Sequence, residues 1–147
     1  MSKVLIPPVF IVFCILLMAL FYICLPQWNI ILFPYNLLGL VVSVFGFSIM
    51  SKARDLFKKN QTTFTYNKAS KLVTDGIFSK SRNPMYIGMT LLLLGIGIIF
   101  TNILSILTTI LFILLVNFIS IPSEEKMMED LFKQEYLEYK KKVSRWI

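Results

Sequence analysis

Two long stretches without a single charged residue constrain this sequence more than any other feature. No Asp, Glu, Lys or Arg occurs from Val4 to Ser51, and none occurs from Asn83 to Ser123. A charged side chain at the centre of a membrane-spanning helix costs about 2.5–3.5 kcal/mol on insertion scales, so such stretches are typical of membrane spans. Each stretch has room for two helices of about 20 residues. The sequence therefore predicts an all-α integral membrane protein with about four transmembrane helices.

The predicted elements form a single membrane-embedded domain over residues 1–147. We expect the spans at about residues 5–25, 35–51, 84–100 and 103–121. Pro122 is expected to end the last span, and Ser123 to serve as the N-cap of a final helix over about residues 123–142. Apolar side chains recur in that helix at spacings of three and four residues, which predicts an amphipathic helix lying on the membrane surface. They are Met128, Leu131, Phe132, Tyr136, Tyr139 and Val143.

The basic residues predict the orientation. Eight of the 15 lie between Lys52 and Arg82, six lie between Lys126 and Arg145, and Lys3 is the remaining one. With four spans, all of them fall on one side of the membrane together with both termini. The positive-inside rule predicts that this side is cytoplasmic. The net charge of +7 is then explained by anionic lipid head groups, so no nucleic-acid partner is predicted. The oligomeric state stays open.

The chain contains no histidine. This excludes His-ligated metal sites and the Ser-His and Cys-His arrangements of nucleophilic catalysis. No metal site is predicted from the remaining residues. Any proton acceptor in a reaction would have to be a carboxylate or a tyrosine.

A first motif, running from Gly76 through Arg82-Asn-Pro-Met-Tyr86 to Gly88, stands where the third span begins. Each residue has an ordinary structural explanation. Asn83 suits an N-cap and Pro84 a first helical position, while Arg82 and Tyr86 could contact lipid head groups. Together, however, they place an arginine beside a helix N-terminus, whose free N–H groups and dipole favour anions. A carboxylate would bind well there.

A second motif starts with Glu124-Glu125 at the end of the fourth span and runs to Arg145-Trp146. Acidic residues in the first turn of a helix are favoured by its dipole, at about 0.3–1 kcal/mol each, which is one explanation for the pair. The alternative is that the two carboxylates bind an ammonium group. An anion-binding and a cation-binding element on the same side of the membrane would match the two ends of an α-amino acid.

The two motifs together resemble the isoprenylcysteine carboxyl methyltransferase family, which grades into the phospholipid N-methyltransferases. The resemblance covers about residues 63–147 and rests on Arg-Asn-Pro-Met-Tyr-x-Gly followed by Glu-Glu-x-x-Met-x-x-x-Phe-x-x-x-Tyr-x-x-Tyr. The chain departs from the usual pattern at three positions. Asn83 stands where eukaryotic members have His, Ile77 where Pro is usual, and Lys133 where Gly is usual. The Asn form and the short chain are similar to bacterial relatives, which implies a location in a bacterial inner membrane.

The resemblance implies a membrane-embedded methyltransferase that uses S-adenosyl-L-methionine. It implies that the cofactor lies between the two motifs, and that Arg82 and Glu125 are catalytic. The implied cofactor-binding residues are Arg82, Asn83, Pro84, Tyr86, Gly88, Glu124, Glu125, Tyr136 and Tyr139. Which of the two glutamates contacts the cofactor stays open. Arg145 is a weaker candidate for contact with the substrate.

The substrate is expected to be lipophilic and dissolved in the membrane, because the motifs lie at the membrane edge. A carboxylate or thiolate arrives already ionised and needs no base, so the lack of histidine favours these groups as methyl acceptors. Methylation of an amine or a phospholipid head group is the alternative enzyme function. The alternative without catalysis is a small membrane scaffold or lipid-binding protein.

Overall fold

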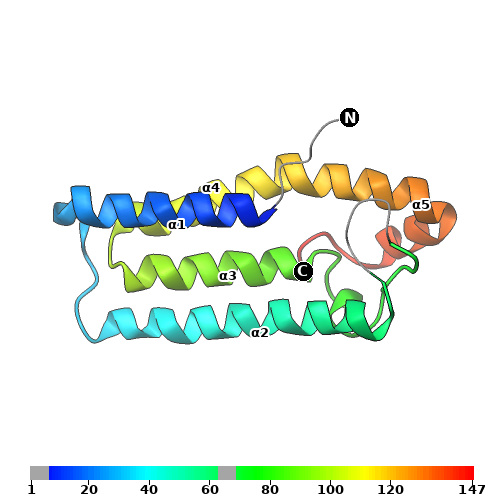
Figure 1. The fold of residues 1–147 in the computed structure, drawn as a ribbon, viewed down its shortest axis with the longest axis horizontal. Helices are drawn as coiled ribbons and strands as arrows, with labels where there is room; N and C mark the ends of the chain where they lie inside the picture. Colours follow the sequence, from blue (N-terminus) through cyan, green and yellow to red (C-terminus); the bar gives the residue numbers. More distant parts are fainter. Residues whose placement is uncertain (1–6, 63–68) are drawn as a thin grey trace.

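Four apolar helices form one bundle in the computed structural model, which describes residues 7–62 and 69–147 (Figure 1). A fifth, charged helix continues from the fourth, and the described residues contain no named β-strand. The all-α membrane fold is thus confirmed. The helices are α1 (Pro7–Cys24), α2 (Leu38–Lys59), α3 (Pro84–Ile99), α4 (Ile103–Leu115) and α5 (Ile121–Lys142). The predicted first span began at residue 5, so its first two residues lie outside the described part.

Apolar side chains on the outside of the bundle identify its surroundings. Phe45, Phe47 and Leu40 of α2 are exposed, as are Ile110 and Leu114 of α4. An outer surface this apolar is unstable in water and suits lipid. The helices Tyr35–Lys59 and Ile103–Lys142 are long and apolar enough to cross a membrane, and Val9–Cys24 and Pro84–Ile99 are shorter apolar helices. That the chain crosses four times stays a prediction.

Glycines bring α2 and α3 into close contact. The backbone at Gly46 faces Gly88, and the backbone at Gly39 faces Gly95. A Cβ added at Gly46 would lie 2.6 Å from the carbonyl oxygen of Gly88 and 2.6 Å from the amide nitrogen of Leu92. Small residues at such positions let helix backbones approach closely in membranes. The second and third helices therefore pack as one unit.

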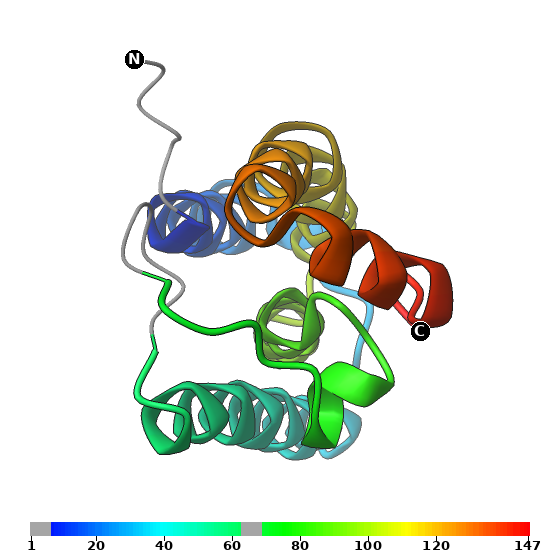
Figure 2. The ribbon, with the colours of Figure 1, turned by 90° about the vertical axis from the view of Figure 1, so that its right-hand side faces the viewer.

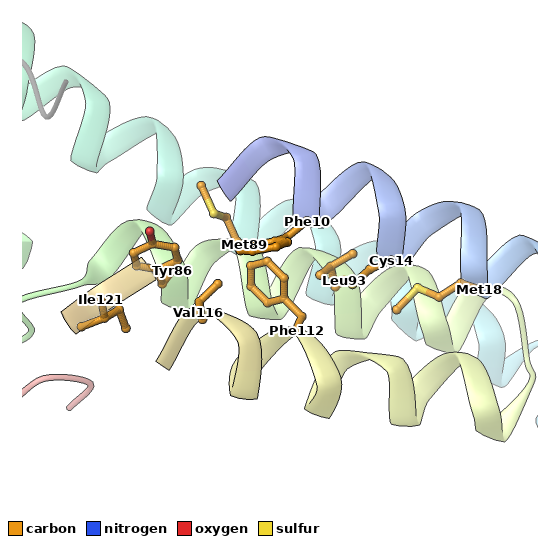
Figure 3. Close-up of a cluster of buried hydrophobic side chains, with 9 residues drawn as sticks. All are labelled: Phe10, Cys14, Met18, Tyr86, Met89, Leu93, Phe112, Val116 and Ile121. Carbon is orange, nitrogen blue, oxygen red and sulfur yellow. The ribbon is translucent and has the colours of Figure 1, made fainter. Parts of the chain in front are cut away.

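The main core lies between α1, α3 and α4 (Figure 3). Its largest fully buried side chains are Phe112, Met18 and Leu93. Tyr86 and Ile121 complete this cluster at the end of the bundle where α5 begins. The apolar core therefore extends up to the first turn of the charged helix.

The opposite end of the bundle is closed by neutral hydrogen bonds around Asn102, which is fully buried. Its side-chain oxygen accepts from the Leu104 amide at 3.0 Å and so caps α4. Its Nδ2 donates to the Leu25 carbonyl at 2.9 Å and to the Asn29 side chain at 2.9 Å, which satisfies acceptors at the end of α1. Thr101, with φ +60°, and Asn102 connect α3 to α4.

The predicted break at Pro122 is wrong. The helix continues from α4 through a π-helical turn, Val116–Ser120, into α5, and Ser123 lies inside α5 instead of capping it. The amide of Ile121 donates to the carbonyl of Val116, five residues back. Proline lacks the amide needed for a regular helical bond, and a widened turn directly before it accommodates the missing bond. At 1.5 Å per residue the continuous helix exceeds a hydrocarbon core of about 30 Å, so its charged part lies beyond the span.

The final helix, predicted over about residues 123–142, does end at Lys142, but it is bent at Lys133. Lys133 has φ +45° and ψ −117°, a conformation that favours glycine. Beyond this residue the helix turns back across the end of the bundle, towards the segment that precedes α3 (Figure 2). The bend brings Tyr136 and Tyr139 onto that segment, where both are buried.

Lys133→Gly should stabilise the protein by about 1 kcal/mol, because glycine adopts this backbone conformation without the strain that a side chain causes. Thermal unfolding in detergent measures the effect. The matched control is Lys126→Gly in the regular part of α5, which should destabilise by about 1 kcal/mol through helix propensity. Destabilisation of similar size at both positions would contradict a strained Lys133.

Candidate functional site at the charged end of the bundle

The segment before α3 is fixed by the last residues of the chain. The amide of Arg82 donates to the Ser144 carbonyl at 3.0 Å, and Asn83 Nδ2 donates to the Arg145 carbonyl at 3.0 Å. The Ser81 hydroxyl donates to the same carbonyl at 3.3 Å. Asn83 does occupy the N-cap position of α3, but its side chain forms no capping hydrogen bond and contacts Arg145 instead. The two sequence motifs are thus joined through backbone contacts.

Glu125 is the centre of an ionic cluster. Its Oε1 lies 3.0 Å from Arg82 Nη1 and accepts from Arg145 Nε at 3.1 Å. Its Oε2 lies 2.9 Å from Arg145 Nη2 and 3.7 Å from Lys140 Nζ. Burial raises the pKa of Glu125, but the Arg145 hydrogen bonds and the charges of Arg82, Arg145 and Lys140 outweigh it and lower the pKa overall. Glu125 is therefore ionised at neutral pH.

Arg82 has donors that the described residues do not satisfy. Its side chain is only 9% exposed, and neither Nε nor Nη1 has a hydrogen-bond partner, although Nη1 contacts Glu125 as an ion pair. Buried polar groups normally form hydrogen bonds, so unused donors on a buried guanidinium indicate capacity for a further acceptor.

Glu124 faces a different neighbour from Glu125. Its Oε1 accepts a hydrogen bond of 2.7 Å from the Tyr86 hydroxyl, at the end of the main apolar core. Among residues 7–62 and 69–147 no lysine or arginine forms an ion pair with it. Burial raises the pKa of Glu124, and the hydrogen bond from Tyr86 only partly offsets this. Two neighbouring carboxylates thus have opposite electrostatic surroundings.

The two tyrosines after the bend hold the returning part of α5 in place. The Tyr139 hydroxyl donates to the Phe78 carbonyl at 2.6 Å, which ties α5 to the 3₁₀ turn Gly76–Ser79. Burial, followed by the nearby Tyr136, raises the pKa of Tyr139, so it is a neutral donor at neutral pH. Tyr136 lies beside both Arg82 and Glu125. Tyr136 therefore borders the ionic cluster, whereas Tyr139 positions the segment around it.

Most of the predicted site residues lie at this one end of the bundle. Arg82, Glu125 and Tyr136 are in mutual proximity, and Tyr86 with Glu124 forms a second polar contact. Gly88 packs against Gly46 and Met50 of α2 instead of facing the cluster. The predicted cofactor-binding and catalytic roles of all these residues stay predictions.

Two further residues join the cluster without having been predicted. Lys140 also pairs with Glu129 at 2.6 Å, and it reaches Glu125 only because α5 bends at Lys133. Asn117 in the π-helical turn accepts from Trp146 Nε1 at 3.2 Å and from Arg145 Nη1 at 3.4 Å. A polar amide near the end of an apolar run was a sequence signal for Asn117, since such groups in membrane helices need partners. No local pattern indicated Lys140.

A shallow apolar groove opens beside the cluster, between α3 and α4. It has a volume of about 290 Å³ and is lined by Ile87, Thr90, Leu91, Ile113, Trp146 and Ile147. Residues of α3 and α4 line it together with the last two residues of the sequence. The site thus combines charged, hydrogen-bonding and apolar surfaces at one edge of the bundle.

Comparison with known proteins gives one family match and two relatives of interest. The sequence profile of the phospholipid methyltransferase family matches residues 34–135. An uncharacterized protein of Haemophilus influenzae is 41% identical over 63 residues, which cover 43% of this chain and all of that protein. The protein-S-isoprenylcysteine O-methyltransferase of Schizosaccharomyces pombe is 39% identical over 80 residues, or 52% of this chain. That alignment spans only 33% of the yeast enzyme.

Proposed function

Because this chain belongs to the phospholipid methyltransferase family, we propose that it transfers a methyl group from S-adenosyl-L-methionine to a lipophilic substrate dissolved in the membrane. The family assignment agrees with the resemblance to isoprenylcysteine carboxyl methyltransferases noted in the sequence. The observation that carries the proposal is the union of both motifs in one cluster, with Arg82 Nη1 only 3.0 Å from Glu125.

The charges of this cluster suit the amino-acid end of the cofactor. Arg82, Arg145 and Lys140 carry three positive charges against the two negative charges of Glu125 and Glu129. One positive charge is left over, and Arg82 has unused buried donors, so a carboxylate would be bound favourably. Tyr136 would border the same group, since it lies beside Arg82.

The protein's contribution to the reaction is orientation and exclusion of water. When bound, the cofactor supplies an electrophilic methyl group on a sulfonium centre. Arg82 and Arg145 would hold the polar cofactor, while the apolar groove between α3 and α4 would accept the apolar part of the substrate from the side. Correct alignment of the two reactants contributes much of the rate in such displacement reactions.

The proposed orientation places the charged end in the cytoplasm, where the cofactor is found. All 15 basic residues belong to the segments at this end or to residue 3, which supports the positive-inside assignment. We further propose a bacterial inner membrane as the location, with membrane lipids as neighbours.

Binding of S-adenosylhomocysteine tests the proposal. Calorimetric titration into the detergent-solubilised protein should give saturable binding, and Arg82→Ala should weaken it by about 10- to 100-fold through loss of charged hydrogen bonds. Lys80→Ala, which removes an exposed basic residue two positions away, should leave affinity unchanged. Gel filtration and circular dichroism check that each variant is folded.

The outcomes separate the function from the site. No binding heat with the intact protein would contradict the methyltransferase function and favour a scaffold or lipid-binding protein. Equal weakening in the Arg82 and Lys80 variants would contradict the site but retain the function.

A further inference from the structure

One amide oxygen, Oδ1 of Asn117, accepts hydrogen bonds from two neighbouring side chains that belong to different parts of the site. Arg145 Nη1 donates to it at 3.4 Å, and Trp146 Nε1 donates to it at 3.2 Å. Arg145 is a member of the ionic cluster around Glu125, whereas Trp146 lines the apolar groove between α3 and α4. A single residue of the π-helical turn thus contacts both parts of the site.

The orientation of the Arg145 guanidinium depends on this contact. Its Nε and Nη2 donate to the two carboxylate oxygens of Glu125 at 3.1 and 2.9 Å, and its Nη1 donates to Asn117. The Arg145 side chain is 35% exposed, so packing alone does not fix it. Because a guanidinium is planar, an acceptor on its third nitrogen fixes the plane in which it meets the carboxylate. Asn117 therefore favours the contact in which Arg145 binds both oxygens of Glu125.

The position of Arg145 decides how many donors Arg82 keeps for a ligand. While Arg145 is bonded to both oxygens of Glu125, Arg82 Nε and Nη1 have no hydrogen-bond partner among the described residues. If Arg145 turned away, Arg82 would bond to the vacated carboxylate, because buried donors take the acceptors within reach. Arg82 would then have fewer donors left for the carboxylate of the cofactor.

Trp146 extends the effect to the apolar groove. Its side chain lines the groove together with Ile113, which lies four residues before Asn117 in the same continuous helix. The hydrogen bond from Nε1 to Asn117 fixes the indole by its polar edge, and an indole N–H at the end of an apolar helix needs such a partner. Loss of the Asn117 oxygen therefore changes one wall of the groove as well as the ionic cluster.

We propose that Asn117 is a positioning residue that couples the two halves of the site, because one oxygen atom orients Arg145 for the cofactor and Trp146 for the groove. This inference rests on the proposed methyltransferase function and adds a residue that neither sequence motif contains. Asn117 acts through its two partners and need not touch either reactant. The widened turn Val116–Ser120 sets the direction of its side chain, and such π-helical turns are frequent at functional sites.

Binding of S-adenosylhomocysteine to the detergent-solubilised protein tests the link to the cofactor. Asn117→Leu replaces the amide by an apolar group of similar shape and should weaken binding about tenfold, the size expected for one lost hydrogen bond to a charged group. Leucine suits a membrane helix, so this variant should stay folded, which gel filtration and circular dichroism check. Phe118→Leu, at an exposed position in the same turn, is the matched control and should leave the affinity unchanged.

A double-mutant cycle with Arg145→Ala separates positioning from a general loss of structure. If Asn117 acts through Arg145, Asn117→Leu should weaken binding about tenfold in the intact protein but by less than about twofold in the Arg145→Ala background. A residue with a merely structural role would give independent losses, which multiply to about 100-fold in the double variant. Losses that multiply in this way would overturn the inference.

The fluorescence of Trp146 measures the link to the groove. The chain has two tryptophans, so Trp28→Phe in the turn after α1 leaves Trp146 as the only one. In this background Asn117→Leu should raise quenching of Trp146 by aqueous acrylamide about twofold, because the freed indole N–H turns towards water. Asn117→Asp keeps an acceptor oxygen at the same place and should restore the lower quenching.

The results separate this inference from the function on which it rests. Unchanged affinity for S-adenosylhomocysteine in Asn117→Leu would overturn the coupling role while the methyltransferase function stands. Unchanged quenching of Trp146, or failure of Asn117→Asp to restore it, would overturn the role in the same way. Failure of the intact protein to bind S-adenosylhomocysteine would contradict the underlying function itself.

Discussion

Glu125→Gln should lower the free energy of unfolding by about 3–5 kcal/mol, because it leaves a buried arginine without its counter-ion. The side chains of Glu125 and Arg82 are only 8% and 9% exposed, so water cannot replace the lost charge. Thermal or denaturant unfolding in detergent measures the loss. Glu129→Gln is the matched control, because its ion pair with Lys140 is more than one third exposed on each side and should contribute at most about 1 kcal/mol.

Lowering the pH should reduce this difference between the intact protein and Glu125→Gln. The folded-state pKa of Glu125 is depressed below its ordinary value of 4.5. Its contribution to stability is therefore complete above pH 4.5 and is lost as the pH falls through the folded-state pKa. A stability difference that stayed constant well below that pKa would show that the ion pairs are not its cause.

Gly95→Ala should destabilise the bundle by about 1–3 kcal/mol or more, although alanine is the better helix former. A Cβ at Gly95 would collide with Gly39 and Ser43 of α2, and it would lie 2.6 Å from the Ser43 amide nitrogen. The clash involves backbone atoms of α2, so the two helices would have to move apart. Unfolding in detergent measures the effect on stability, and methyl transfer measures the effect on the distant site.

Gly97→Ala on the same helix is the control for this substitution. Its Cβ would face α4, with the nearest atoms at 3.1 Å, a tight contact that small movements can relieve. The loss should therefore be clearly smaller than at Gly95. Equal effects at both positions would contradict close backbone packing of α2 and α3 as the reason.

The membrane helices were predictable because the signal is local. Long uncharged stretches identify spans wherever they occur, and α3 begins at Pro84 and α4 at Ile103 as predicted. The end of the last span was not predictable in the same way. Pro122 indicates a break by local rules, yet the π-helical turn before it keeps the helix continuous. Lysine itself gives no signal for a bend, because it is a good helix former. The one indication was that glycine is usual at this position in the family that the motifs resemble, since glycine adopts the positive φ found at Lys133 without strain.

The candidate site was predictable as a set of residues but not as a set of contacts. Composition and motif order predicted that Arg82 and Glu125 lie on the same side of the membrane, but did not predict that they contact each other. Adjacent residues on a helix point about 100° apart, so Glu124 and Glu125 had to face different neighbours. Which neighbour each one meets depends on the rotation of α5, and this is set by the π-helical turn Val116–Ser120. A one-residue change of helix register is invisible to pattern analysis.

The uncharged end of the bundle has a consequence for how the protein is made. The connections at this end, residues 25–37 and 100–102, contain no Asp, Glu, Lys or Arg, and the buried amide of Asn102 closes it with neutral hydrogen bonds. If the chain crosses four times as predicted, each pair of helices would enter the bilayer as a hairpin whose leading loop carries no charge across the hydrocarbon. A lysine introduced into either loop would have to cross with its full desolvation cost. The neutral hydrogen bonds of Asn102 thus stabilise the folded bundle. They also mean that no charged group of this loop has to be desolvated when the helices insert into the membrane.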